Sequence, residues 1–263
     1  MQLRTRSVLI GMGASAAIVA LISLGGCPSR PHGPEATPGT AVGASPPAPG
    51  SLQPRHEGRP YDVEPRESLL TILAFRGGAL AKAGHNHVIA SHDMSGTLYV
   101  PDDQSRSTFE VRVPVDQLTI DEPEQRAKEG SDFPTEVPDS AKEGTRRNML
   151  SEALLNGAQY PDITLVSQHI ETPAAPGSAV RADVQVTIRG QVHTVSVPVT
   201  YSFADSRLIV SGELPIKQTD LGLTPFSAML GALQVQDELR VRFRIVARQA
   251  QLHGADAQSQ HLR

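Results

Sequence analysis

The sequence predicts an all-β fold in which about eight antiparallel strands surround one core, with one short amphipathic helix added. Apolar and polar residues alternate in several runs, and this is the period of a half-buried strand. Most connections between these runs are short, so neighbouring strands should be antiparallel. The 263 residues carry a net charge of −4, which gives no indication of a nucleic-acid-binding protein.

The clearest alternation runs from Val180 to Phe203 and changes parity at Gly190. Apolar residues occupy even positions before this glycine and odd positions after it. A hairpin loop with an even number of residues produces such a change, and we place a type II′ turn at Gly190-Gln191. In this register Ile188 lies opposite His193. One face of the hairpin is then aliphatic and has to be buried.

Six further runs have the composition of strands. They are Leu69–Arg76, Met94–Val100, Phe109–Val115, Ile163–Ile170, Leu208–Lys217 and Val241–Ile245. Eight strands that close on themselves can hold one small ligand, as in lipocalin-type barrels. A two-sheet sandwich would give the same periodicity, so both architectures stay open at this point.

The N-terminal 27 residues have the features of a bacterial lipoprotein signal peptide. Arg4 and Arg6 precede an apolar stretch that ends in Leu24-Gly25-Gly26-Cys27, and Cys27 is the only cysteine of the chain. Such a start is typical of a secretory signal, and its ending resembles a lipobox, which implies lipidation of Cys27. The alternative is an uncleaved membrane anchor. The resemblance to Gram-negative lipoproteins, with Pro28 rather than aspartate after the cysteine, implies sorting to the periplasmic face of the outer membrane.

Residues 28–60 are rich in proline, glycine and alanine and should form a flexible tether. The folded domain should then span residues 61–250, and a disordered tail should cover 251–263. Within the domain, Asp116–Gly144 is acidic and contains proline, which predicts an exposed loop. Thr145–Asn156 has helical periodicity. This helix should close one end of the barrel. For the apolar residues of Asp220–Gly231, packing in the core is favoured over an apolar lip at the other mouth.

Short motifs in a common order connect the domain to a known family. They are Ser95-Gly96-Thr97-Leu98, Asn148-Met149-Leu150, Tyr160-Pro161-Asp162-Ile163, Val186-Thr187-Ile188-Arg189-Gly190 and Asp220-Leu221-Gly222-Leu223. From about Leu69 to Ala247 the chain resembles the YceI-like polyisoprenoid-binding proteins. The resemblance implies an extended antiparallel barrel that holds a long isoprenoid, such as a prenyl phosphate or a quinone tail. It departs from the family at Gly84-His85-Asn86-His87 and in the acidic insert.

A lipid-filled barrel requires an aliphatic interior wall, and the alternation shows which residues would supply it. Ala182 and Gly212 would leave room for the ligand. The predicted wall consists of Ala182, Val184, Val186, Ile188, Val195, Val197, Val199, Tyr201, Val210, Leu214, Val241 and Phe243. The polar head group of the ligand would lie at the mouth, near His85, His87 and His193.

The pair His85 and His87 also permits a metal hypothesis. Two residues apart on a strand, both imidazoles face the same way and could bind one zinc or copper ion, with His92 or His193 completing the site. The alternative is a polar pair at the barrel rim. The domain is not expected to be an enzyme, because it lacks a Gly-x-Ser-x-Gly elbow, a free thiol and a phosphate loop. A lipid carrier that requires no cofactor is therefore predicted, with a metal-binding or surface interaction module as the alternative. The oligomeric state is left open.

Overall fold

Twelve strands, all paired antiparallel, form one continuous sheet in the computed structural model, which describes residues 56–134, 136–174 and 178–251. The strands are β1 (Arg59–Val63), β2 (Leu69–Gly77), β3 (His87–Ser91), β4 (Ser95–Val100), β5 (Thr108–Pro114), β6 (Thr119–Ile120), β7 (Asp162–Ile170), β8 (Val180–Ile188), β9 (Gln191–Ala204), β10 (Arg207–Lys217), β11 (Ser227–Ala228) and β12 (Leu233–Gln249). The predicted signal peptide with Cys27, the tether up to residue 55 and the tail from residue 252 lie outside the described residues.

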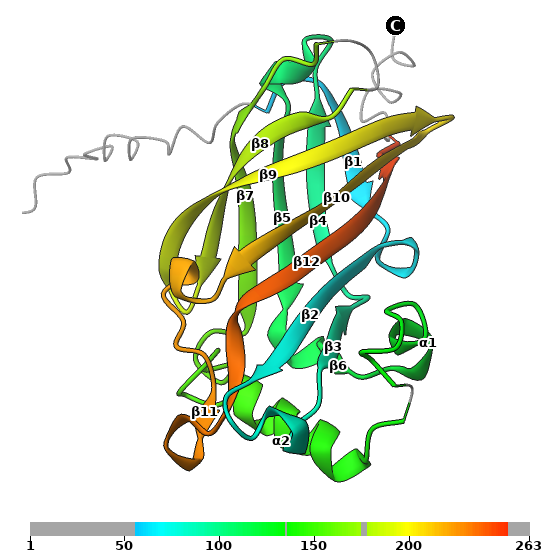
Figure 1. Ribbon diagram of the computed structural model, residues 1–263. Coiled ribbons are helices and arrows are strands. Elements are labelled where there is room, and N and C mark those ends of the chain that lie inside the picture. The colour runs from blue at the N-terminus through cyan, green and yellow to red at the C-terminus, as the bar shows by residue number, and fades with distance from the viewer. Residues whose placement is uncertain (1–55, 135, 175–177, 252–263) are drawn as a thin grey trace, which may run out of the picture. The chain divides into compact units, whose positions relative to one another are not determined.

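Eight of these strands close into a barrel, in the order β1-β4-β5-β7-β8-β9-β10-β12. The closing contact joins β12 to β1, with Tyr61 opposite Gln249. The all-β fold class is therefore confirmed, and the barrel holds rather than the sandwich. The other part of β12 pairs with β2, which adds the branch β2-β3-β6 beside the barrel (Figure 1). Alternation alone did not reveal β1, β3, β6 and β11, which are too short to show a period.

The central hairpin has the predicted aliphatic face, but its turn lies one residue earlier than predicted. The loop is Arg189-Gly190, and both residues have positive φ angles, 51° and 70°. This is the pattern of a type I′ turn rather than type II′. As a consequence, Ile188 pairs with Gln191, and Val186, not Ile188, lies opposite His193. The register moves by two positions, so every side chain stays on its predicted face.

The helices are short, and the prediction for this region was partly wrong. They are α1 (Pro123–Arg126) and α2 (Asp139–Leu150), with single 3-10 turns η1 (Pro65–Glu67), η2 (Ala81–Ala83), η3 (Gln104–Arg106), η4 (Val115–Gln117), η5 (Thr219–Leu221) and η6 (Met229–Gly231). Helix α2 starts six residues before Thr145, because Pro138 provides the N-cap position and Asp139 the acidic first turn. It ends at Leu150, and residues 151–156 form turns. No helix in the described part of the chain has the length and apolar character needed to cross a membrane.

The acidic insert is not an exposed loop as predicted. Its first part folds into β6 and α1, and Phe133 is buried with Leu73 and Val88. Figure 1 shows α1 beside β3 and β6, outside the barrel. This packing explains why Leu69–Arg76 is apolar at both parities: one face of β2 lines the barrel and the other lies under the insert. A strand that is buried on both faces loses its alternation.

Candidate functional site

The barrel encloses an apolar cavity of about 700 Å³. All twelve residues of the predicted wall line it, and the central hairpin alone supplies eight of them, Ala182, Val184, Val186, Ile188, Val195, Val197, Val199 and Tyr201. The volume falls within the roughly 300–1,000 Å³ that is usual for small-molecule sites. Gly212 does not contribute space, because a Cβ atom there would lie 2.6 Å from the ring of Phe243. The phenyl ring already fills the gap that the glycine was expected to leave.

Helix α2 lies across one end of the barrel, at the bottom of Figure 1. Its residues Gly144, Thr145, Asn148 and Met149 line that end of the cavity, together with His85 and His87. The cavity reaches the surface here, since Arg76, Ala83 and Gln234 line it and are also exposed. Towards the β4–β5 connection, the polar lining residue Gln104 accepts a 2.5 Å hydrogen bond from the hydroxyl of Tyr201. Between these two ends the wall is almost wholly aliphatic.

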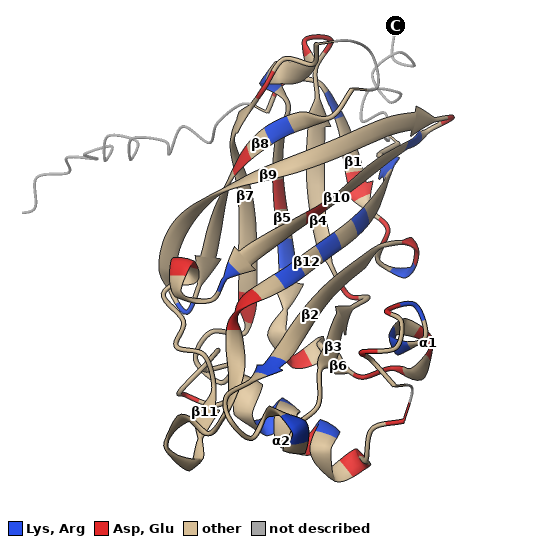
Figure 2. Ribbon diagram, in the orientation of Figure 1, with Lys and Arg blue, Asp and Glu red and all other residues tan. Residues whose placement is uncertain are grey.

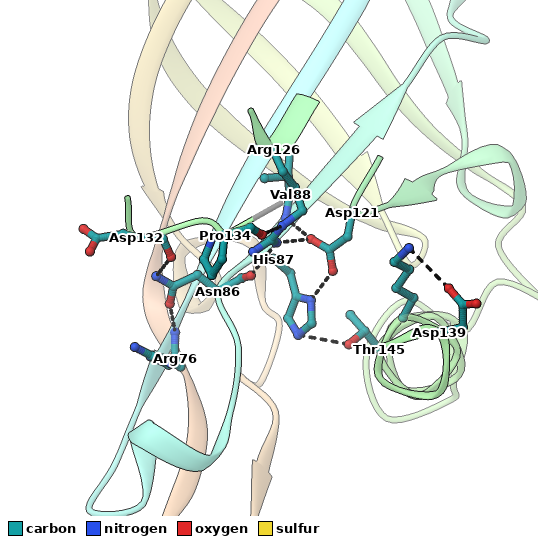
Figure 3. A network of polar contacts seen from close by, with 11 residues as sticks. Arg76, Asn86, His87, Val88, Asp121, Arg126, Asp132, Pro134, Asp139 and Thr145 are labelled. Atoms are coloured by element: carbon teal, nitrogen blue, oxygen red, sulfur yellow. Dashed lines mark hydrogen bonds and ion pairs between the residues drawn. The ribbon is translucent and has the colours of Figure 1, made fainter. Parts of the chain in front are cut away.

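His87, Asp121 and Arg126 form a group that we call the charged cluster (Figure 3). Of the three, His87 lines the polar end of the cavity. The Asp121 side chain is fully buried, and Arg126 is 1% exposed. Asp121 accepts hydrogen bonds from His87 Nδ1 at 2.6 Å, from the Val88 amide at 2.9 Å and from the Arg126 guanidinium. Arg126 also donates to the backbone carbonyls of Asn86 and Pro134. The cluster therefore joins the insert to the start of β3.

The charge state of the cluster follows from these contacts. Burial by itself would raise the pKa of Asp121, but the hydrogen bonds from His87, Val88 and Arg126 together outweigh it and lower the pKa. The ionised carboxylate fixes the proton of His87 on Nδ1. His87 Nε2 then lies 3.1 Å from the hydroxyl of Thr145, on α2. The imidazole thus connects β3 to the helix that covers this end of the barrel.

The three predicted head-group histidines are in different environments. His87 has chain partners on both ring nitrogens. His85 has its ring 6.2 Å from that of His87 and forms no hydrogen bond to any described residue, so it remains free to bind a ligand. His193 is half-buried near Gly222, and its buried Nε2 has no hydrogen-bond partner in the described chain. It is not one of the cavity-lining residues, so its position does not favour the head-group role predicted for it.

Among the described residues, none supplies a third ligand to the metal site predicted at His85 and His87. Within residues 56–134, 136–174 and 178–251, no group of three or more His, Cys, Asp or Glu side chains could hold a metal ion. His92, one of the suggested additional ligands, lies 3.0 Å from Glu122 instead. Zinc or copper binding by His85 and His87 therefore stays a prediction without structural support.

Comparison with known families assigns the domain. The model of the YceI-like domain matches residues 61–247. The chain belongs to this family. The match confirms the resemblance seen in the sequence and covers all of the barrel except the first two residues of β1 and the last two of β12. Among curated proteins, none matches this YceI-like chain.

One solved structure is similar to this chain in its fold. BcnA from Burkholderia cenocepacia is 18% identical, with a TM-score of 0.51 over 70% of this chain and 99% of that one. Two further structures are less similar. A polyisoprenoid binding domain from Saccharophagus degradans is 12% identical, with a TM-score of 0.48 over 72% and 98% of the two chains. The YceI protein of Campylobacter jejuni reaches a TM-score of 0.43 at 11% identity, over 60% and 82%.

Proposed function

We propose that this YceI-like domain binds a long apolar chain, of the polyisoprenoid or quinone type, inside its barrel. The observation that carries the proposal is the continuous aliphatic cavity of about 700 Å³. Aliphatic walls offer shape and burial but few directional bonds, which suits a hydrocarbon tail. Each buried methylene contributes about 0.8 kcal/mol, so a long tail can bind firmly without a strong polar contact.

The polar head group of the ligand would lie at the α2 end. His85 is free there, and Arg76 donates to the Gly84 carbonyl while forming no ion pair with a described carboxylate. Both side chains line the cavity. They offer hydrogen-bond donors to a hydroxyl, carbonyl or phosphate oxygen. The role of His87 is to hold α2 in place through Thr145 rather than to bind the head group directly.

Ala182→Phe tests the cavity, because a phenyl ring at this buried position would project into it. We expect the variant to fold, at a cost of about 1–3 kcal/mol from overpacking, and to bind much less of a fluorescent polyprenol than the wild type. Arg181→Phe is the matched control, since Arg181 is exposed on the outer face of the same strand. Mass spectrometry of organic extracts from gently purified wild type should identify the natural ligand. Extracts without lipid, together with an Ala182→Phe variant that unfolds, would show that the interior is a packed core.

We further propose that Cys27 is lipidated and anchors the domain at the periplasmic face of the outer membrane. The support lies in the sequence: the positive start, the apolar stretch and the Leu-Gly-Gly-Cys ending. A multiply acylated N-terminus holds a protein stably on a bilayer, whereas one chain binds only marginally. Cys27→Ala should therefore lose the acyl chains from the intact mass. A wild-type intact mass that shows no acyl chains would remove the anchor from the proposal.

A further inference from the structure

Three exposed apolar side chains gather at the end of the barrel where the cavity reaches the surface. They are Leu80, Met229 and Leu230, which are 44%, 70% and 109% exposed, and we call them the apolar tip. Among the described residues, only Val192 and Phe203 are other large apolar side chains with comparable exposure. Folding of the domain alone leaves the tip in water, so the tip requires another explanation.

The two connections that carry the apolar tip are fixed to each other. The Leu80 amide donates to the Ala232 carbonyl at 2.7 Å. Met229 and Leu230 both have left-handed backbone angles, with φ of 53° and 57°. This conformation is unfavourable for side chains with a Cβ atom, and here it holds both side chains outward instead of burying them. Backbone strain that is not offset by burial of the side chains is typical of a functional segment.

The tip is continuous with the cavity. Ala83 and Gly84, on the connection that carries Leu80, line the cavity, as do Phe226 and Leu233 on the connection that carries Met229 and Leu230. The sequence prediction that residues 220–231 pack in the core holds for buried Leu223 but not for the tip. The less favoured alternative was an apolar lip at the mouth opposite the helix. It describes the exposure of these last residues correctly but not their place, since the tip lies at the same end as α2.

The two connections that carry the tip contain no carboxylate. Between Gly77 and His92 the only charged residue is Lys82, and none lies between Leu221 and Gln236. Arg76 stands at the end of β2, where Figure 2 shows blue next to the uncoloured β11 connection. Apolar side chains near Lys82 and Arg76, on connections without a carboxylate, suit the interface of a bilayer with anionic lipids.

We propose that the apolar tip inserts into the facing leaflet of a phospholipid bilayer and brings the cavity opening against the membrane. An apolar ligand then passes between bilayer and barrel without crossing water. The occupant is a bilayer rather than a protein, because the side chains project from two short connections at the cavity opening and the charged group on these connections, Lys82, is positive. The transfer of a ligand rests on the proposed lipid binding, whereas the insertion of the tip can be measured without a ligand.

The chain contains no tryptophan, so one introduced tryptophan reports on its own surroundings. In full-length protein with Leu230→Trp, mixed with phosphatidylethanolamine and phosphatidylglycerol vesicles, we expect emission to shift to shorter wavelength and brominated acyl chains to quench it. Val192→Trp is the matched control, since Val192 is 56% exposed on β9, away from the tip. An unchanged emission from the Leu230→Trp variant, or equal quenching of the two variants, would overturn the proposal, because equal quenching would mean that the domain is merely held near the vesicle.

A second variant connects the tip to ligand exchange. With Met229→Ser and Leu230→Ser combined, transfer of a fluorescent polyprenol from vesicles to the protein should slow by roughly tenfold or more, since two large apolar side chains no longer enter the bilayer. The amount bound at equilibrium should not change. An unchanged transfer rate would contradict the exchange role. If wild type binds no polyprenol while the emission of the Leu230→Trp variant is still quenched, the proposed function fails and the membrane contact stands.

Discussion

Two regions beside the cavity are stabilised in opposite ways. One is the aliphatic wall of the β8–β9 hairpin, and the other is the charged cluster of His87, Asp121 and Arg126. The wall has many similar side chains, and no single contact determines its shape. The cluster has three side chains whose polar atoms depend on one another. Loss of one group should therefore be tolerated in the wall and not in the cluster, and this difference can be measured.

The largest effect should come from Asp121→Asn. The change keeps a residue that tolerates the left-handed backbone of position 121, where φ is 56°, but it leaves the Arg126 charge buried without its counter-ion. Breaking a buried ion pair costs about 3–5 kcal/mol, and urea unfolding should show a loss of this size.

Glu110→Gln is the control for this prediction, because it removes a carboxylate that binds Arg112 on the exposed face of the barrel. Its unfolding midpoint should not move measurably. Adding Arg126→Met to Asp121→Asn should recover part of the lost stability, since the unpaired charge is then gone. If Asp121→Asn is no more costly than Glu110→Gln, the cluster does not differ from an ordinary surface pair.

A smaller effect is expected from Val184→Ala in the wall. The loss should be about 1–2 kcal/mol, because roughly two methylene equivalents leave the interior and the existing cavity makes a new void unnecessary. Val88→Ala is the comparison: Val88 is 1% exposed and packs against Leu73 and Phe133, outside the cavity. It should cost more, since a void forms there. Equal losses in urea unfolding would show that the wall is packed as tightly as the region under the insert.

The smallest effect concerns pH. The pKa of Asp121 is lowered in the folded protein, so its stabilising contribution is present above the unfolded value of about 3.9 and is lost as the pH falls through the folded pKa. Urea midpoints measured from about pH 6 down to pH 3 should therefore fall more steeply for wild type than for Asp121→Asn. Parallel curves would mean that other carboxylates, such as Glu122 with its lowered pKa, carry the acid dependence.

The sequence could predict the wall because period-two alternation reports directly which face of a strand is buried. It missed the turn position, since Arg189 gives no sign of its positive φ. The charged cluster could not be predicted, because His87 and Asp121 are 34 positions apart and only the folded insert joins them. Pro138-Asp139 was a usable signal for the start of α2. Within the acidic insert, Phe133 was the sign that part of it is buried.

The strand β12 pairs with β10 along one edge and, along the other, first with β2 and then with β1. It thus joins residues from the two ends of the domain, Tyr61 and Gln249. In kinetic terms this is a high contact order, for which folding takes on the order of milliseconds to seconds. The chain cannot close its interior until its last strand is available. A ligand that occupies the cavity can therefore be enclosed only after the whole domain has been synthesised and β12 has paired with β1.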